Sequence, residues 1–137
     1  MDRDYILHFC CGIIFGMILF AGMNYFLGGK EVDVIIGEAE GEPYMGKLAV
    51  ACAIRNRGTL VGVYGQNARR VKDKLYSRQV LIDSTLAWEE SKYPAKCEFI
   101  SGAQHWQSQE DLAKHPSWVT NCDQKTIIGG HTFFKCS

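Results

Sequence analysis

The feature that most constrains this 137-residue chain is an uncharged run from Tyr5 to Gly29, "YILHFCCGIIFGMILFAGMNYFLGG". The run is longer than the roughly 20 residues that an α-helix needs to cross a bilayer. A cleaved signal peptide fits less well, because its apolar region usually has about 7–15 residues and follows a basic segment, whereas "MDRD" is not basic. The sequence therefore predicts a transmembrane anchor at residues 1–30, with a signal peptide or a buried core helix as alternatives.

The composition of this run predicts a weak anchor. Glycines dilute its apolar character, and Gly12 and Gly16 form a G-x-x-x-G step that can let two such helices pack closely. We therefore expect weak self-association through these two residues. Arg3 and Lys30 flank the run on opposite sides, so the distribution of basic residues does not set its orientation.

Residues 31–137 are enough for one further domain. The chain has 15 basic and 15 acidic residues, and this balance excludes the strongly basic surface of a nucleic-acid-binding protein. Helical spacing predicts a helix over about residues 44–57 that ends at Gly58. Its expected buried face consists of Met45, Leu48, Ala49, Cys52 and Ala53.

The remaining segments predict a mainly α domain with a small β part. A second helix is expected over about residues 79–91, after a glycine-rich loop that begins at Gly58. The stretches "EFISGAQHW" and "TIIGGHTFFK" are β-prone, and they could pair as a hairpin or lie against the helices.

Three carboxylates, Glu38, Glu40 and Glu42, fall within five residues, with no cation between them. They could form a solvated tip, a metal site, or a catalytic acid with its supports. Pro43 suits the first turn of a helix, and Glu42 would then face the positive end of that helix. This is a sufficient structural explanation for Glu42, and a functional role stays equally open.

Residues of the kinds that bind metals are also present later in the chain. They are Cys97, His105, His115, Cys122 and His131. Their spacing matches neither C-x-x-C nor H-E-x-x-H, so we expect no metal site and no cofactor.

Four stretches resemble the SleB/CwlJ-type cell-wall hydrolases, the spore cortex-lytic enzyme family that also occurs among phage lysis genes. "GEAEGEPYMGKLAVACAIRNR" resembles the opening motif of that family, and "GAQHW", "HPSW" and "IGGHTFFK" resemble its later motifs. The resemblance covers most of residues 34–135 in order. The residues that match the opening motif are Glu38, Ala39, Gly41, Glu42, Pro43, Gly46, Ala49, Val50, Asn56 and Arg57.

This chain departs from the family pattern at Gly37 and at Glu40, where the family often has arginine. Its middle, from about Gly58 to Cys97, is shorter and lacks the family's aromatic-Ser segment. Contacts with a ligand from that middle region therefore cannot be transferred from the family.

The resemblance implies a lysozyme-like fold, cleavage of peptidoglycan glycan strands, and Glu38 as the catalytic acid. The apolar residues around Glu38 agree with this role, because such surroundings help a glutamic acid to keep its proton. On spacing alone, Glu40 or Glu42 could be the second acid of a hydrolase. The resemblance instead favours a single acid that makes a 1,6-anhydro sugar, which is the lytic transglycosylase reaction.

We expect four residues to bind substrate or to support the acid: Glu42, Tyr64, His105 and Trp106. Trp118 is assigned to core packing. The predicted function is cleavage between N-acetylmuramic acid and N-acetylglucosamine, in phage lysis or wall penetration. The alternatives are a hydrolysing muramidase and a non-catalytic glycan-binding module.

The expected location is the inner membrane, with residues 5–29 in the lipid bilayer and the catalytic domain on the extracytoplasmic side. Thiols there meet an oxidising compartment. A disulfide is expected among the cysteines of the tail, with Cys97–Cys122 as first choice, and Cys52 is expected to be a buried free thiol. The weak anchor resembles the signal-anchor-release segments of some phage endolysins, and a permanent tether is equally open.

Overall fold

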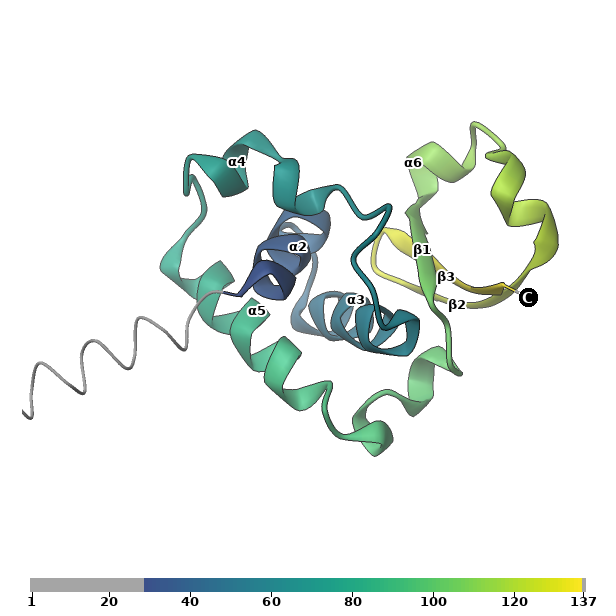
Figure 1. Ribbon diagram of the computed structural model, residues 1–137, viewed down its shortest axis with the longest axis horizontal. Helices are drawn as coiled ribbons and strands as arrows, with labels where there is room; N and C mark the ends of the chain where they lie inside the picture. Colours follow the sequence, from purple (N-terminus) through teal and green to yellow (C-terminus); the bar gives the residue numbers. More distant parts are fainter. Residues whose placement is uncertain (1–28, 137) are drawn as a thin grey trace, which may run out of the picture.

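The computed structural model describes residues 29–136, apart from the side chain of Lys125, and shows a helical domain with a small antiparallel sheet (Figure 1). The helices are α2 (Lys30–Ala39), α3 (Tyr44–Arg57), α4 (Arg69–Lys72), α5 (Arg78–Glu90) and α6 (Gln109–Leu112). Short 3-10 helices are η1 (Gly65–Asn67), η2 (Pro94–Lys96), η3 (Glu98–Ile100) and η4 (Ser117–Asn121). The strands are β1 (His105–Ser108), β2 (Cys122–Ile128) and β3 (His131–Cys136). The predicted mainly α domain with a small β part is confirmed.

The predicted anchor at residues 5–29 and its G-x-x-x-G step lie outside the described residues, except for Gly29. Within residues 29–136, none of the helices combines the length and the apolar character that a membrane span requires.

Helix α3 lies at the centre of the helical part (Figure 1). Every residue from 46 to 54 is buried, so neighbouring elements cover its whole circumference, and its many small residues let them approach closely. The predicted bounds and the stop at Gly58, which has a left-handed φ of 69°, are confirmed. The prediction that Met45 is buried is wrong: it is 48% exposed, because it lies in the first turn beside exposed Pro43.

Helix α2 carries the predicted acid at its C-terminal end. Its buried residues are mainly β-branched and have low helix propensity, so tertiary packing rather than local preference holds this helix. The side chain of Lys47, on α3, is buried, and its Nζ donates to the carbonyl oxygens of Glu40, at 3.2 Å, and of Glu42. A cation at these carbonyls complements the negative end of α2 and ties the acid-bearing segment to the central helix.

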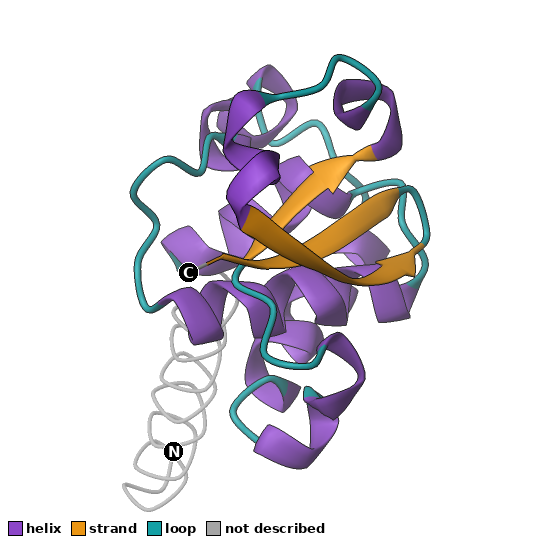
Figure 2. Ribbon diagram, turned by 90° about the vertical axis from the view of Figure 1, so that its right-hand side faces the viewer, coloured by secondary structure: helices purple, strands orange, loops and turns teal. Residues whose placement is uncertain are grey.

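The three strands form one sheet in the order β1-β3-β2, which packs against the helices (Figure 2). Strand β3 is its buried centre, with Phe133 and Phe134 at 0% and 2% exposure. The two β-prone stretches do pair, as β1 with β3, but the tight hairpin is β2–β3, whose turn at Gly129 and Gly130 lies within "TIIGGHTFFK". Only the last part of "EFISGAQHW" is a strand, because Glu98–Ile100 form a 3-10 turn.

The expected disulfide among the tail cysteines is confirmed, but its pairing is not the first choice. Cys52 bonds to Cys97, and Cys122 bonds to Cys136. The predicted Cys97–Cys122 bond and the free thiol at Cys52 are both wrong. Pairing of β2 with β3 places Cys122 opposite Cys136, with their Cα atoms 4.1 Å apart, and such proximity between distant residues is invisible in linear spacing.

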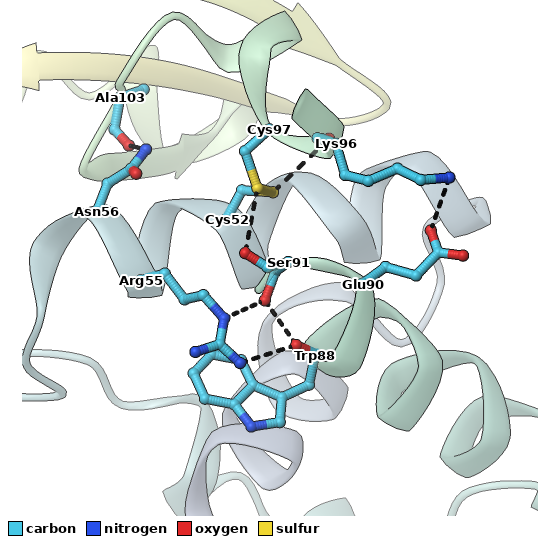
Figure 3. Close-up of a disulfide and its surroundings, with 9 residues drawn as sticks. All are labelled: Cys52, Arg55, Asn56, Trp88, Glu90, Ser91, Lys96, Cys97 and Ala103. Carbon is cyan, nitrogen blue, oxygen red and sulfur yellow. Dashed lines mark hydrogen bonds and ion pairs between the residues drawn. A yellow bond between two sulfur atoms is a disulfide. The ribbon is translucent and has the colours of Figure 1, made fainter. Parts of the chain in front are cut away.

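The Cys52–Cys97 disulfide joins α3 to the segment after α5 (Figure 3). Beside it, the Arg55 guanidinium lies 3.7 Å from the centre of the Trp88 ring and donates to Ser91 Oγ at 2.6 Å (Figure 3). The stacked cation therefore holds α3 against α5, and the covalent bond holds α3 against the segment that follows α5.

We expect Cys52→Ala/Cys97→Ala to lower the free energy of unfolding by about 2–4 kcal/mol, the usual effect of losing a disulfide. The two cysteines are 45 residues apart, so the bond removes considerable freedom from the unfolded chain. Urea unfolding of the full chain in detergent measures the loss. A change below about 0.5 kcal/mol, the usual effect of a surface substitution, would contradict the stabilising role of the Cys52–Cys97 bond.

Candidate active site

A cleft of about 540 Å³ opens between the loop after α3, strand β1 and the end of the sheet beside η4. Its described lining combines one acid, one arginine, aromatic rings and a disulfide. The lining residues are Glu38, Arg57, Gly62, Val63, Tyr64, His105, Trp106, Gln107, Trp118, Asn121, Cys122 and Cys136. The structure thus brings together four of the predicted site residues: Glu38, Tyr64, His105 and Trp106.

Two hydrogen-bond donors hold the carboxyl group of Glu38. The backbone N–H of Gly65 donates to Oε1 at 2.7 Å, and the indole Nε1 of Trp106 donates to Oε2 at 3.3 Å. These donors come from η1 and β1, and each bonds to a different oxygen of the carboxyl group. Glu38 is therefore held in one orientation at the wall of the cleft, where a ligand can reach it.

The close approach of η1 to α2 requires glycine on both sides. A Cβ at position 37 would lie 1.9 Å from the carbonyl oxygen of Gly65, and a Cβ at position 65 would lie 2.6 Å from Glu38 Cγ. No rotation of a side chain can relieve the first clash, because its partner is backbone. Gly37, one of the departures from the family pattern, thus lets the Gly65 N–H reach Glu38.

The other two acids of the cluster are not among the lining residues of the cleft. Both carboxylate oxygens of Glu42 lie 3.1 Å from the N–H of Gly130, and Oε1 lies 3.4 Å from His131 Nδ1. Glu42 therefore connects the α2–α3 segment to the β2–β3 turn. Glu40 pairs with Arg70 at 2.8 Å. In residues 29–136, no three side chains of His, Cys, Asp or Glu form a group that could hold a metal ion.

Trp118 lies in the cleft, and its assignment to core packing is wrong. It is 38% exposed, and its ring centre lies 5.5 Å from that of Phe134 and 5.8 Å from that of His105. It belongs to η4, a short 3-10 turn that follows Pro116. None of the residues of η4 is buried. The absence of apolar periodicity around "HPSW" was the sequence signal that Trp118 does not belong to the core.

Arg57 also lines the cleft, and it was not among the predicted site residues, because an arginine in the last turn of a helix is ordinary.

Burial lowers the pKa of His105 from its usual 6.5, and the nearby Arg57 cation lowers it further. The folded state therefore disfavours the imidazolium form. As pH falls below 6.5 the unfolded chain takes up the proton first, so this group reduces stability at acidic pH and has no effect well above 6.5.

When the pH is lowered from about 7 to about 5, the range in which histidine titrates, the stability of the wild-type chain should fall. We expect the stability of His105→Gln to fall less over the same range. Thermal melting at a series of pH values measures this difference. Parallel pH profiles for the two proteins would show that His105 does not titrate differently in the folded state.

The fold is similar to that of two solved SleB catalytic domains. The catalytic domain of the germination-specific lytic transglycosylase SleB from Bacillus anthracis aligns with a TM-score of 0.54 and 24% identity, covering 77% of this chain and 91% of that one. The catalytic domain of the Bacillus cereus SleB protein aligns with a TM-score of 0.50 and 24% identity, covering 77% and 86%. Comparisons with models of known families and with curated proteins find no match.

Proposed function

We propose that this domain cleaves bacterial peptidoglycan between N-acetylmuramic acid and N-acetylglucosamine as a lytic transglycosylase. The observation that carries the proposal is Glu38, the one carboxylate among the described residues that line the cleft. The fold shared with the SleB catalytic domains and the motif resemblance support it.

In the proposed reaction, protonated Glu38 donates its proton to the glycosidic oxygen as the bond from that oxygen to C1 of muramic acid breaks. The resulting carboxylate then accepts the proton of the C6 hydroxyl of the same sugar, while O6 bonds to C1. One group thus serves as acid and then as base, and no water is consumed. The Gly65 and Trp106 donors keep the carboxyl oriented through both steps.

The lining of the cleft favours this route over hydrolysis. A hydrolase with two carboxylates needs the second one about 5–9.5 Å from the first. The two candidates on spacing, Glu40 and Glu42, instead contact Arg70 and the turn at Gly130. The rings of Tyr64 and Trp118, 74% and 38% exposed, suit the apolar faces of sugars.

We expect the purified full-length chain in detergent to clear a peptidoglycan zymogram and to release 1,6-anhydromuramyl ends. Mass spectrometry of the digest identifies these ends, because they lack one water relative to reducing muramic acid. Reducing muramic acid ends would mean hydrolysis, and reducing glucosamine ends would reject cleavage on the muramic side. Glycan binding without clearing would favour the non-catalytic alternative.

For the location, we propose a single-pass inner-membrane protein with this domain on the extracytoplasmic side, acting in phage lysis or wall penetration. The disulfides Cys52–Cys97 and Cys122–Cys136 support that side of the membrane, because such bonds persist in oxidising compartments. Fractionation before and after treatment of cells with an uncoupler distinguishes release of the anchor from a permanent tether. Protein that stays in the membrane fraction, with no gain in lysis, would eliminate release.

A further inference from the structure

The Cys122–Cys136 disulfide closes the open end of the β2–β3 hairpin, and both of its cysteines line the cleft. We propose that this bond positions the wall of the cleft formed by Trp118 and Asn121, and that glycan binding depends on the bond being formed. The inference rests on the proposed function, since it assigns this wall to the glycan.

The wall is joined directly to the disulfide. Trp118 and Asn121 belong to η4, and Cys122 follows immediately as the first residue of β2. Cys122 Sγ lies 3.2 Å from the carbonyl oxygen of Trp118, a packing contact, because a disulfide sulfur has no hydrogen to donate. On its other side, Cys136 belongs to β3, the buried central strand. The bond therefore fastens the C-terminal end of η4 to the central strand of the sheet.

The segment that leads into the wall is held by local bonds. The backbone N–H groups of Ala113, His115 and Val119 donate to carbonyl oxygens three or four residues earlier. Such bonds shape the turns but do not place them over the sheet. The contacts of the Trp118 ring with His105 and Phe134 help to hold η4 against the sheet. The Cys122–Cys136 disulfide adds a covalent link between the two.

The bond forms by exchange with a disulfide oxidant. The thiolate of one cysteine attacks the oxidant and displaces one thiol, and the second cysteine then displaces the other. Two electrons and two protons pass from Cys122 and Cys136 to the oxidant, which leaves as two thiols. A chain whose two residues are still thiols retains Glu38 and its donors but has a loosened wall.

The second disulfide provides a matched control. Cys97 bonds to fully buried Cys52 on α3, and neither residue is among those that line the cleft. Loss of this bond should lower stability without reshaping the cleft. The comparison separates a positioning effect from a general loss of stability.

The experiment compares Cys122→Ser/Cys136→Ser with Cys52→Ala/Cys97→Ala as full chains in detergent, acting on soluble glycan strands at a temperature where both are folded. We expect the first variant to raise KM about tenfold, equivalent to about 1.4 kcal/mol, with kcat within about threefold, and the second to leave KM unchanged. Hydrogen exchange over residues 113–121 should become faster in the first variant alone. In a Trp118→Ala background, loss of the Cys122–Cys136 bond should raise KM by less than about twofold, because both changes act on one wall.

An unchanged KM in Cys122→Ser/Cys136→Ser, or an equal rise in both disulfide variants, would overturn the inference while the proposed function stands. A wild-type chain that cleaves no glycan would overturn the proposed function instead. In that case, equal hydrogen exchange over residues 113–121 in the wild type and in Cys122→Ser/Cys136→Ser would also overturn the positioning of the wall.

Discussion

Replacing Glu38 by glutamine is expected to lower glycan cleavage about 10²–10⁴-fold, the usual contribution of a general acid–base group, and to leave the domain folded. The amide oxygen of glutamine can still accept the bond from the Gly65 N–H that Oε1 now receives at 2.7 Å. The amide cannot protonate the leaving oxygen or accept the proton of the sugar hydroxyl. Zymography and mass spectrometry of released fragments measure activity, and circular dichroism measures folding.

Glu40→Gln is the matched control, because it removes a carboxylate two residues away that pairs with Arg70. We expect its activity to stay within about twofold of wild type, since exposed ion pairs contribute little. The opposite pattern, with an active Glu38→Gln and an inactive Glu42→Gln, would reassign the acid to Glu42 and contradict the proposed mechanism.

Gly37→Ala is expected to lower cleavage at least about tenfold and to reduce the free energy of unfolding by about 1–3 kcal/mol, the usual cost of forcing extra volume into a packed site. The new methyl group would lie 1.9 Å from the Gly65 carbonyl oxygen. The backbone of η1 must then move away from α2, and the Gly65 N–H moves away from Glu38. Enzyme assays and urea unfolding measure the two effects.

Gly41→Ala is the control for this substitution, because a Cβ at position 41 would meet no atom within 4 Å. We expect it to keep wild-type activity and stability. If Gly37→Ala melts and cleaves like the wild type, the contact between η1 and α2 does not position Glu38.

Much of the helical part could be predicted from local patterns. Helix α3 begins after Pro43 and ends at Gly58, as the spacing of its apolar residues and these two residues indicate. The apolar spacing and the two end residues each act within one or two helical turns, so they can be recognised without knowledge of the rest of the chain. The predicted acid, Glu38, rested on the motif resemblance, and the structure places it in a cleft with His105 and Trp106.

The sequence by itself thus determined the positions of helices α3 and α5 and of the β-prone tail, because these depend on neighbours along the chain, while the candidate acid came from the motif resemblance. Only the tertiary structure decided which cysteines pair, that Trp118 faces the cleft, and that Gly37 meets Gly65. The physical reason is that each of these features joins segments far apart in the sequence. Their proximity is set by how the helices and the sheet pack, and no local pattern of residues records it.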